Sequence, residues 1–179
     1  MNKLFGLALL IIGMVLAVGA GANFRYYSAD RHASFDIVTD DNELIDLTPL
    51  QPYVKFNGNG NMYVDFSENN SNRPSGGGIG LSPNTTYVFE EMFEVSNELW
   101  ENNETDFPIC VKINTNHEQV KVFAGNYTSP IAGPASNIQF TVYHGNPVKV
   151  GMIFDTTNAT LGSEQFNMLI TADRGTCGP

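Results

Sequence analysis

Histidine, cysteine and acidic side chains are the residues of this sequence that could carry out catalysis or hold a metal. The three histidines, His32, His117 and His144, stand far apart, and none belongs to an H-E-x-x-H motif. A catalytic zinc ion needs about three protein ligands, which isolated histidines do not supply. The chain also lacks the G-x-S-x-G turn that exposes a serine nucleophile. We therefore expect a protein that is not an enzyme and needs no metal or cofactor; a glycosidase-like pair among the scattered acids is the hydrolase alternative.

The densest group of oxygen donors is an acidic segment at residues 40–46. Side-chain oxygens of this kind suit calcium, but their spacing is not that of an EF-hand loop. A solvated turn is therefore the favoured interpretation, and calcium binding is the alternative. The oxygen donors are Asp40, Asp41, Asn42, Glu43 and Asp46.

Cys110 and Cys177 are the two cysteines of the chain. In an oxidising compartment two cysteines usually pair, whereas a redox-active pair normally has the much closer C-x-x-C spacing. We predict a structural disulfide between them. It would close a loop of about 66 residues, which the chain-entropy model values at roughly 4 kcal/mol. It would also hold the C-terminal tail against the strand that carries Cys110.

The first 22 positions have the three parts of a secretory signal peptide. Lys3 is the only charge before Arg25, residues 4–18 are almost wholly apolar, and residues 20–22 are small. This order matches the charged, apolar and cleavage regions of a signal peptide, so we predict that residues 1–22 are removed. A retained membrane anchor is the alternative, because about 19 uncharged residues could just span a bilayer.

The mature chain is predicted to be strongly acidic. Without Lys3, 8 of the 9 basic residues remain against 19 acids, a net charge of −11. Nucleic acid and anionic membrane surfaces both require basic patches, so we expect neither as a partner once the leader is gone. The remaining chain of about 157 residues is long enough for one domain with its own core.

Five N-x-[ST] sequons could carry glycans if the chain is exported to a compartment that attaches them. All five fall in or beside polar stretches that are interpreted as loops. The sequons begin at Asn69, Asn84, Asn103, Asn126 and Asn158.

Short apolar alternations separated by turn residues run through most of the mature chain. Residues 54–56 and 62–66 alternate on either side of N-G-N-G, which predicts a hairpin. The pattern predicts about eight to ten such strands, of which the first spans residues 33–39. Residues 96–106 and the Gly- and Pro-containing residues 125–136 are interpreted as loops. Because no amphipathic helix of three turns is present, we predict an all-β fold for residues 32–179. The expected architecture is an antiparallel β-sandwich with Ig-like or jelly-roll topology.

The segment after the leader reads as two extended pieces. Phe24 and Tyr26 occupy even-numbered positions, whereas Phe35 and Ile37 occupy odd-numbered positions. One continuous strand would place these pairs on opposite faces, so the polar residues 30–32 are interpreted as a hinge. Residues 23–31 are thus predicted to be a short strand and hinge that could complete either its own sheet or another molecule's. The strand consists of Asn23, Phe24, Arg25, Tyr26, Tyr27, Ser28, Ala29 and Asp30.

Four stretches carry a resemblance to a known family. They are N-F-R-Y-Y-S-A-D-R directly after the leader, V-D-F-S-E-N-N at residues 64–70, the glycine run that ends in G-L-S-P-N at residue 84, and T-Y-V-F-E-E-M-F-E-V-S-N at residues 86–97. In the order of these four stretches, the chain resembles the archaeal bundling pilins. It resembles the bacterial biofilm matrix protein TasA and camelysin more distantly.

The resemblance implies an extracellular structural subunit that polymerises with copies of itself by donor-strand complementation. Residues 23–30 would insert into the groove of a neighbouring subunit, and the filaments would bundle laterally and hold cells together in a biofilm. Camelysin-like proteins have been classed as metallopeptidases, an activity that we do not carry over because the chain shows no zinc motif. The alternative is a monomeric secreted module that binds cell-surface glycans through Trp100 and loop tyrosines, with residues 23–30 folded back as an ordinary edge strand.

Overall fold

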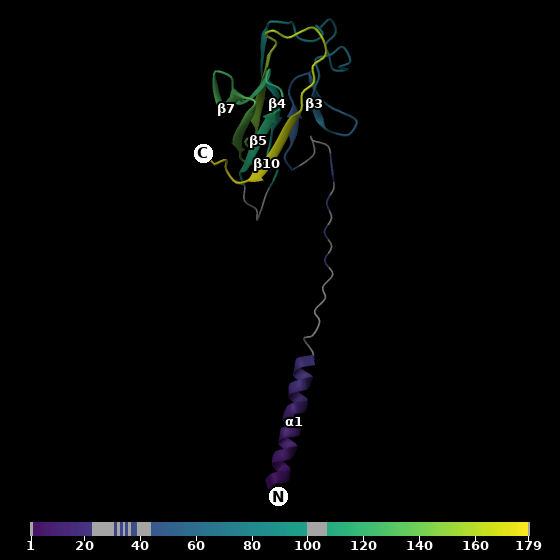
Figure 1. The fold of residues 1–179 in the computed structure, drawn as a ribbon, viewed down its shortest axis with the longest axis vertical. Coiled ribbons are helices and arrows are strands. Elements are labelled where there is room, and N and C mark those ends of the chain that lie inside the picture. Colours follow the sequence, from purple (N-terminus) through teal and green to yellow (C-terminus); the bar gives the residue numbers. More distant parts are fainter. Residues whose placement is uncertain are drawn as a thin grey trace. The chain divides into compact units, whose positions relative to one another are not determined.

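Figure 1 shows the computed structural model of the chain, which describes residues 2–22, 31, 33, 35, 37–38, 44–99 and 107–178. The chain divides into two compact units, Met1–Asp36 and Ile37–Pro179. The first unit holds helix α1 (Asn2–Ala22), which is formed by the apolar run predicted to be the leader. No helix among the described residues is long and apolar enough to cross a membrane.

The predicted strand at residues 33–39 is absent at the positions that the structure describes. Phe35 and Ile37 lie in no strand, and their side chains are 85% and 91% exposed. An apolar stripe forms a stable strand only with partner strands and a surface to cover it, and the described part of the chain provides neither here. The predicted strand at residues 23–30, His32, and residues 39–43 lie outside the described residues, as do Trp100 and Asn103.

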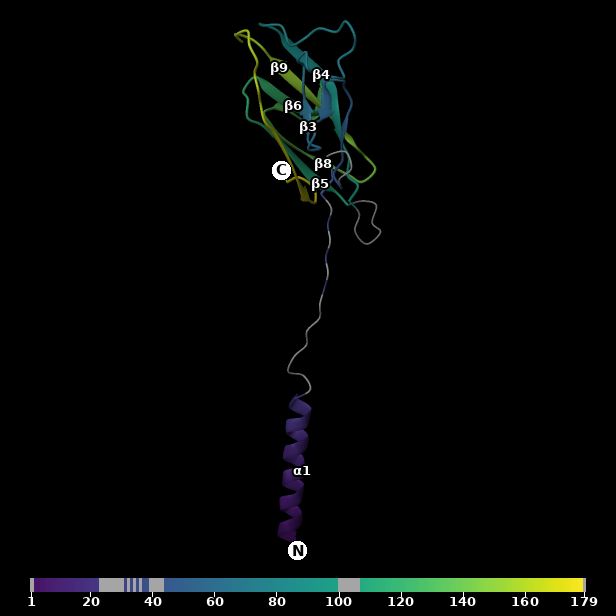
Figure 2. The same cartoon turned by 90° about the vertical axis from the view of Figure 1, so that its right-hand side faces the viewer.

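Two antiparallel sheets form the second unit, which confirms the predicted all-β sandwich (Figures 1 and 2). The larger sheet has the strand order β1-β4-β9-β6-β7 and the smaller sheet has the order β10-β5-β8, while β2 and β3 form a separate hairpin. The larger sheet consists of β1 (Leu47–Pro49), β4 (Thr86–Val95), β6 (Val120–Asn126), β7 (Ser129–Ala135) and β9 (Val148–Asp155). The other strands are β2 (Val54–Phe56), β3 (Met62–Val64), β5 (Ile109–Thr115), β8 (Asn137–Val142) and β10 (Met168–Arg174).

The core lies between the two sheets and is built by alternation along the strands. On β5, Ile109, Val111 and Ile113 are buried, whereas Lys112 is exposed. Successive strand side chains point to opposite faces, so this pattern fixes which face of β5 meets the larger sheet. The hairpin of β2 and β3 forms where the sequence predicts it and packs Val54 into the same core.

Strand β7 corrects the prediction that residues 125–136 form a loop. The strand pairs with β6 through an irregular register and contains Pro130 and Pro134. Proline has no N–H to donate to a ladder, so it is confined to edge strands and bulges. Because β7 is the last strand of its sheet, it tolerates the prolines that favour a loop when the sequence is read alone.

The outer face of the larger sheet is shaped by a bulge in β4. The register between β4 and β9 shifts between Phe89 and Phe93. Phe123 on β6 points away from the central core yet is fully buried, because its ring lies over Gly151 of β9. A Cβ atom on Gly151 would come within 2.2 Å of that ring, so only glycine fits this position.

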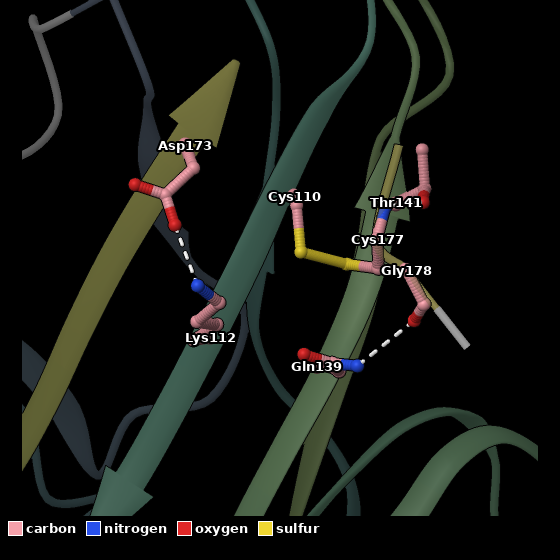
Figure 3. The surroundings of a disulfide bond; sticks show 7 residues. All are labelled: Cys110, Lys112, Gln139, Thr141, Asp173, Cys177 and Gly178. Atoms are coloured by element: carbon pink, nitrogen blue, oxygen red, sulfur yellow. Dashed lines mark hydrogen bonds and ion pairs between the residues drawn. A yellow bond between two sulfur atoms is a disulfide. The ribbon is translucent and has the colours of Figure 1, made fainter. Parts of the chain in front are cut away.

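The predicted disulfide between Cys110 and Cys177 is present (Figure 3), with an S–S distance of 2.09 Å. Cys110 alternates with the core residues Ile109 and Val111 and therefore lies on the outer face of β5. The bond holds the C-terminal tail across the smaller sheet, where the Cys177 N–H donates to Thr141 Oγ1 of β8 at 3.0 Å. Gln139 Nε2 then donates to the Gly178 carbonyl at 3.1 Å.

Candidate strand-acceptor groove

The most unusual feature of the sandwich is the free edge of β10. All seven residues of this strand pair with β5, and on its other side no strand of the described chain pairs with it. Met168, Ile170 and Ala172 are half-buried and pack against the core, whereas Leu169 on the opposite face is 64% exposed. From Met168 to Ala172 the strand contains neither proline nor charge, so it lacks the devices that usually protect an edge.

The other edges are better protected. Strand β1 spans three residues and ends in Pro49, and β7 carries two prolines and an irregular register. Strand β8 follows β7 after Ser136, and the two strands lie in contact, so they close that side of the sandwich. Among the described edges, β10 therefore combines a regular register with a stretch free of proline and charge, and β8, which shares these features, is flanked by β7.

The hairpin of β2 and β3 approaches the start of β10, because Phe66 after β3 and Phe166 before β10 both contact Phe154. We take the hairpin and β10 as the two walls of a candidate acceptor site. Within the described chain it joins neither sheet by a ladder, although Met62, Val64 and the following Phe66 pack against the core. The side chain of Asn70 fixes the base of the hairpin by donating to the carbonyls of Pro52 and Asp65, at 3.0 and 2.8 Å. Within the described chain the hairpin is thus held in place without pairing to β10.

A single aromatic ring forms the floor between these two walls. Phe154 of β9 is 6% exposed, and its ring meets Phe66 edge-on at 5.1 Å and Phe166, just before β10, at 5.9 Å. The end of β3 and the start of β10 therefore cover the same residue of the larger sheet. We call the region bounded by Phe66, Phe154 and Phe166, together with the outer side of β10, the edge groove.

A cavity of about 380 Å³ lies at this end of the edge groove. Its apolar lining includes Val64, Phe66, Val120, Phe154 and Phe166. Its rim is polar and includes Thr156, Ser163 and the pair of His117 and Glu164, whose Nε2 and Oε2 atoms are 3.9 Å apart.

An ion pair supports the hairpin beside the cavity. Lys55 Nζ and Asp65 Oδ2 are 3.1 Å apart, and the two side chains are 12% and 16% exposed. A hydrogen bond with Tyr63, together with the Asp65 carboxylate, raises the pKa of Lys55 above its ordinary value against the effect of burial. Burial also acts to raise the pKa of Asp65, but hydrogen bonds from Ser67 and Lys55 outweigh it and lower that pKa.

Four of the five sequon asparagines lie in the described residues, and all four are exposed. The N–H of Asn158 donates to Asn84 Oδ1 at 2.9 Å, so two sequons that are distant in sequence are neighbours. Asn126 Oδ1 accepts from the Thr128 N–H and hydroxyl within its own turn. The sequons are thus placed on the surface, as the sequence predicts, at Asn69, Asn84, Asn126 and Asn158.

Sequence reasoning did not identify the walls and floor of the edge groove. Phe66 lies in the predicted strand at residues 62–66, but its convergence with Phe154 and Phe166 depends on contacts between segments about 100 positions apart in a non-local fold. Within the described residues no cluster of three or more His, Cys, Asp or Glu side chains is placed to hold a metal ion.

The fold is a β-sandwich in which, within the described chain, the edge strand β10 of the smaller sheet pairs on one side only. The chain belongs to the family described as "Protein of unknown function (DUF1102)", whose model matches residues 37–177. A comparison with curated proteins finds no match.

Proposed function

We propose that this protein is the structural subunit of an extracellular filament and that it polymerises by donor-strand complementation. Residues 23–30 of one copy would lie in the edge groove of the next. The observation that carries the proposal is the edge of β10 from Met168 to Ala172, which has neither proline nor charge and which no other strand of the described chain pairs on its outer side. In this arrangement the partner is another copy of the same chain.

The inserted strand would satisfy two needs of the groove at once. Its backbone groups would hydrogen-bond to the free edge of β10, in the manner of β-strand addition. Its apolar side chains would cover Met168, Ile170 and the Phe154 floor, and each buried Phe or Tyr contributes roughly 1.5–3 kcal/mol. Residues 23–30 offer three aromatic side chains for this purpose.

Strand exchange between copies explains why the product would be a filament. Each copy donates one surface and accepts on another, so the contact is heterologous and does not close on itself. Lateral bundling of such filaments would support cell–cell adhesion and biofilm formation. The proposed location is the cell surface, after cleavage of residues 1–22, and no nucleic acid, membrane or cofactor takes part.

Negative-stain electron microscopy of two purified proteins tests the proposal. The first begins at Asn23 and the second begins at Arg31, so the second lacks only the donor strand. We expect filaments from the first and folded monomers from the second. If both remain folded monomers, strand exchange is excluded.

The cavity supports a second candidate, a monomeric module that binds cell-surface glycans. Its polar rim and aromatic floor could accept a sugar ring. Size-exclusion chromatography and glycan-array binding of the protein that begins at Asn23 distinguish the two functions. A monomer that binds glycans would favour the module, whereas a polymer without glycan binding would favour the filament subunit.

A further inference from the structure

The cavity lies at one end of the edge groove, beyond the point where β10 begins. We propose that it holds the side chain of Phe24 from the donor strand of a neighbouring copy, which fixes the direction of that strand. The inference rests on the proposed strand exchange and adds to it a specific side chain and an orientation.

The lining of the cavity fits an aromatic side chain. Phe66 and Phe166 already meet Phe154 edge-on, and a further ring would extend this arrangement in the geometry that aromatic pairs favour. Leu81 and Val120 add further apolar lining beside these three rings. A volume of about 380 Å³ lies within the range of pockets that hold a compact ligand group.

The position of the cavity selects Phe24 among the aromatic residues of the donor strand. Phe24, Tyr26 and Ser28 share one face, and Tyr27 lies on the other. Because the cavity is at the end of the groove, it receives a side chain from one end of this stripe. The two end residues are Phe24 and Ser28, and only Phe24 is aromatic.

The direction of the donor strand follows from this assignment. Phe66 comes just after β3 and Phe166 comes just before β10, and both contact Phe154. The two walls of the groove therefore run in opposite directions. A strand that begins at the cavity runs parallel to β10 and antiparallel to β3, with Tyr26 near Met168 and Ser28 near Ile170 at the two-residue spacing of about 6.6 Å.

Photo-crosslinking of filaments tests the assignment directly. The protein that begins at Asn23 is made with p-azidophenylalanine in place of Phe24 or, as the matched control, in place of Tyr27. We expect the label at position 24 to join peptides that contain residues 64–66 or 159–166 of another copy, and the label at position 27 to avoid them. Crosslinks from position 24 to residues 172–174, at the far end of β10, would overturn the inference.

Filling the cavity provides a second test that uses the unmodified donor strand. Ser163 is exposed at the rim, so Ser163→Trp adds bulk there without disturbing the core. Ser136→Trp, at an exposed position between β7 and β8, is the control. We expect the Ser163 variant to polymerise at least tenfold more slowly than the control.

These outcomes separate the two proposals. If the wild-type protein forms no filaments, the proposed function fails. If the wild type and both tryptophan variants form filaments at equal rates, strand exchange stands and the assignment of Phe24 to the cavity is wrong.

Discussion

At the scale of single residues, the Lys55–Asp65 ion pair is the main charged interaction beneath the hairpin. The pKa of Asp65 is lowered in the folded protein, so the charged carboxylate stabilises the fold. That contribution is fully present above the ordinary carboxyl pKa of about 3.9 and is lost as the pH falls through the lowered folded value. The hairpin wall of the edge groove is therefore expected to loosen in acid.

The variant Asp65→Asn should be less stable than the wild type at pH 7 by about 1–3 kcal/mol, because it leaves the mostly buried Lys55 without its charged partner. Urea unfolding at pH 7 and at pH 3 measures the difference, which should shrink at the lower pH. Asp173→Asn is the control, since Asp173 pairs with Lys112 on the exposed face at 2.6 Å. Exposed pairs contribute about 0–1 kcal/mol, so equal losses in the two variants would show that burial adds nothing to the Lys55–Asp65 pair.

Gly151 provides a second residue-scale prediction. Substitution to alanine would place a methyl group within 2.2–2.7 Å of three atoms of the Phe123 ring, and overpacking of this kind costs about 1–3 kcal/mol. Thermal unfolding should show a lower Tm for Gly151→Ala than for the wild type. Gly58→Ala is the control, because the new Cβ would meet no atom within 4 Å; a similar decrease in both variants would argue against the clash.

At the scale of elements, β10 is the strand on which the proposed exchange depends. Ile170 is half-buried on the core side of β10, whereas the adjacent Leu169 lies on the opposite face and is 64% exposed. Ile170→Lys should abolish or strongly slow filament growth, because a charge would be buried under the donor strand. Leu169→Lys should polymerise like the wild type. Circular dichroism checks that both variants are folded, and equal polymerisation by two folded variants would place the acceptor site elsewhere.

Much of the element pattern could be predicted because it is local. The hairpin of β2 and β3 depends on alternation and on the N-G-N-G turn between them, which involve neighbouring residues only, and it appears in the structure where expected. Strand β7 was missed because its prolines favour a loop unless its edge position is known. Strand β1 was missed because three residues are too short for a period to be visible.

The edge groove could not be predicted because it depends on pairings between distant segments. Its walls come from β3 and β10, and the sequence does not indicate that these strands would face each other unpaired. The prediction of a strand at residues 33–39 failed at the described positions for a related reason. An alternating apolar stripe indicates that a segment can form a strand, but a strand also requires a partner.

At the scale of the whole molecule, the edge groove should accept the donor strand from solution. A synthetic peptide of residues 23–30, added to the protein that begins at Arg31, should raise its Tm by about 5–10 °C at one hundred times the Kd, because ligand binding stabilises the folded state. Differential scanning calorimetry measures the shift. A peptide with Phe24 and Tyr26 replaced by aspartate is the control, and an equal shift with both peptides would show that binding does not use the apolar stripe.

The disulfide bond has a mechanical consequence for a subunit under tension. It joins residues that are 67 apart in sequence and links the chain just after β10 directly to β5. A pulling force that arrives at β10 therefore reaches β5 through a covalent link, and the chain between the two cysteines cannot be drawn out. Each residue released from a fold adds at most about 3.3–3.6 Å of length, so the bond limits stretching to the chain before Cys110. Reduction of this bond would convert a stiff link into an extensible one.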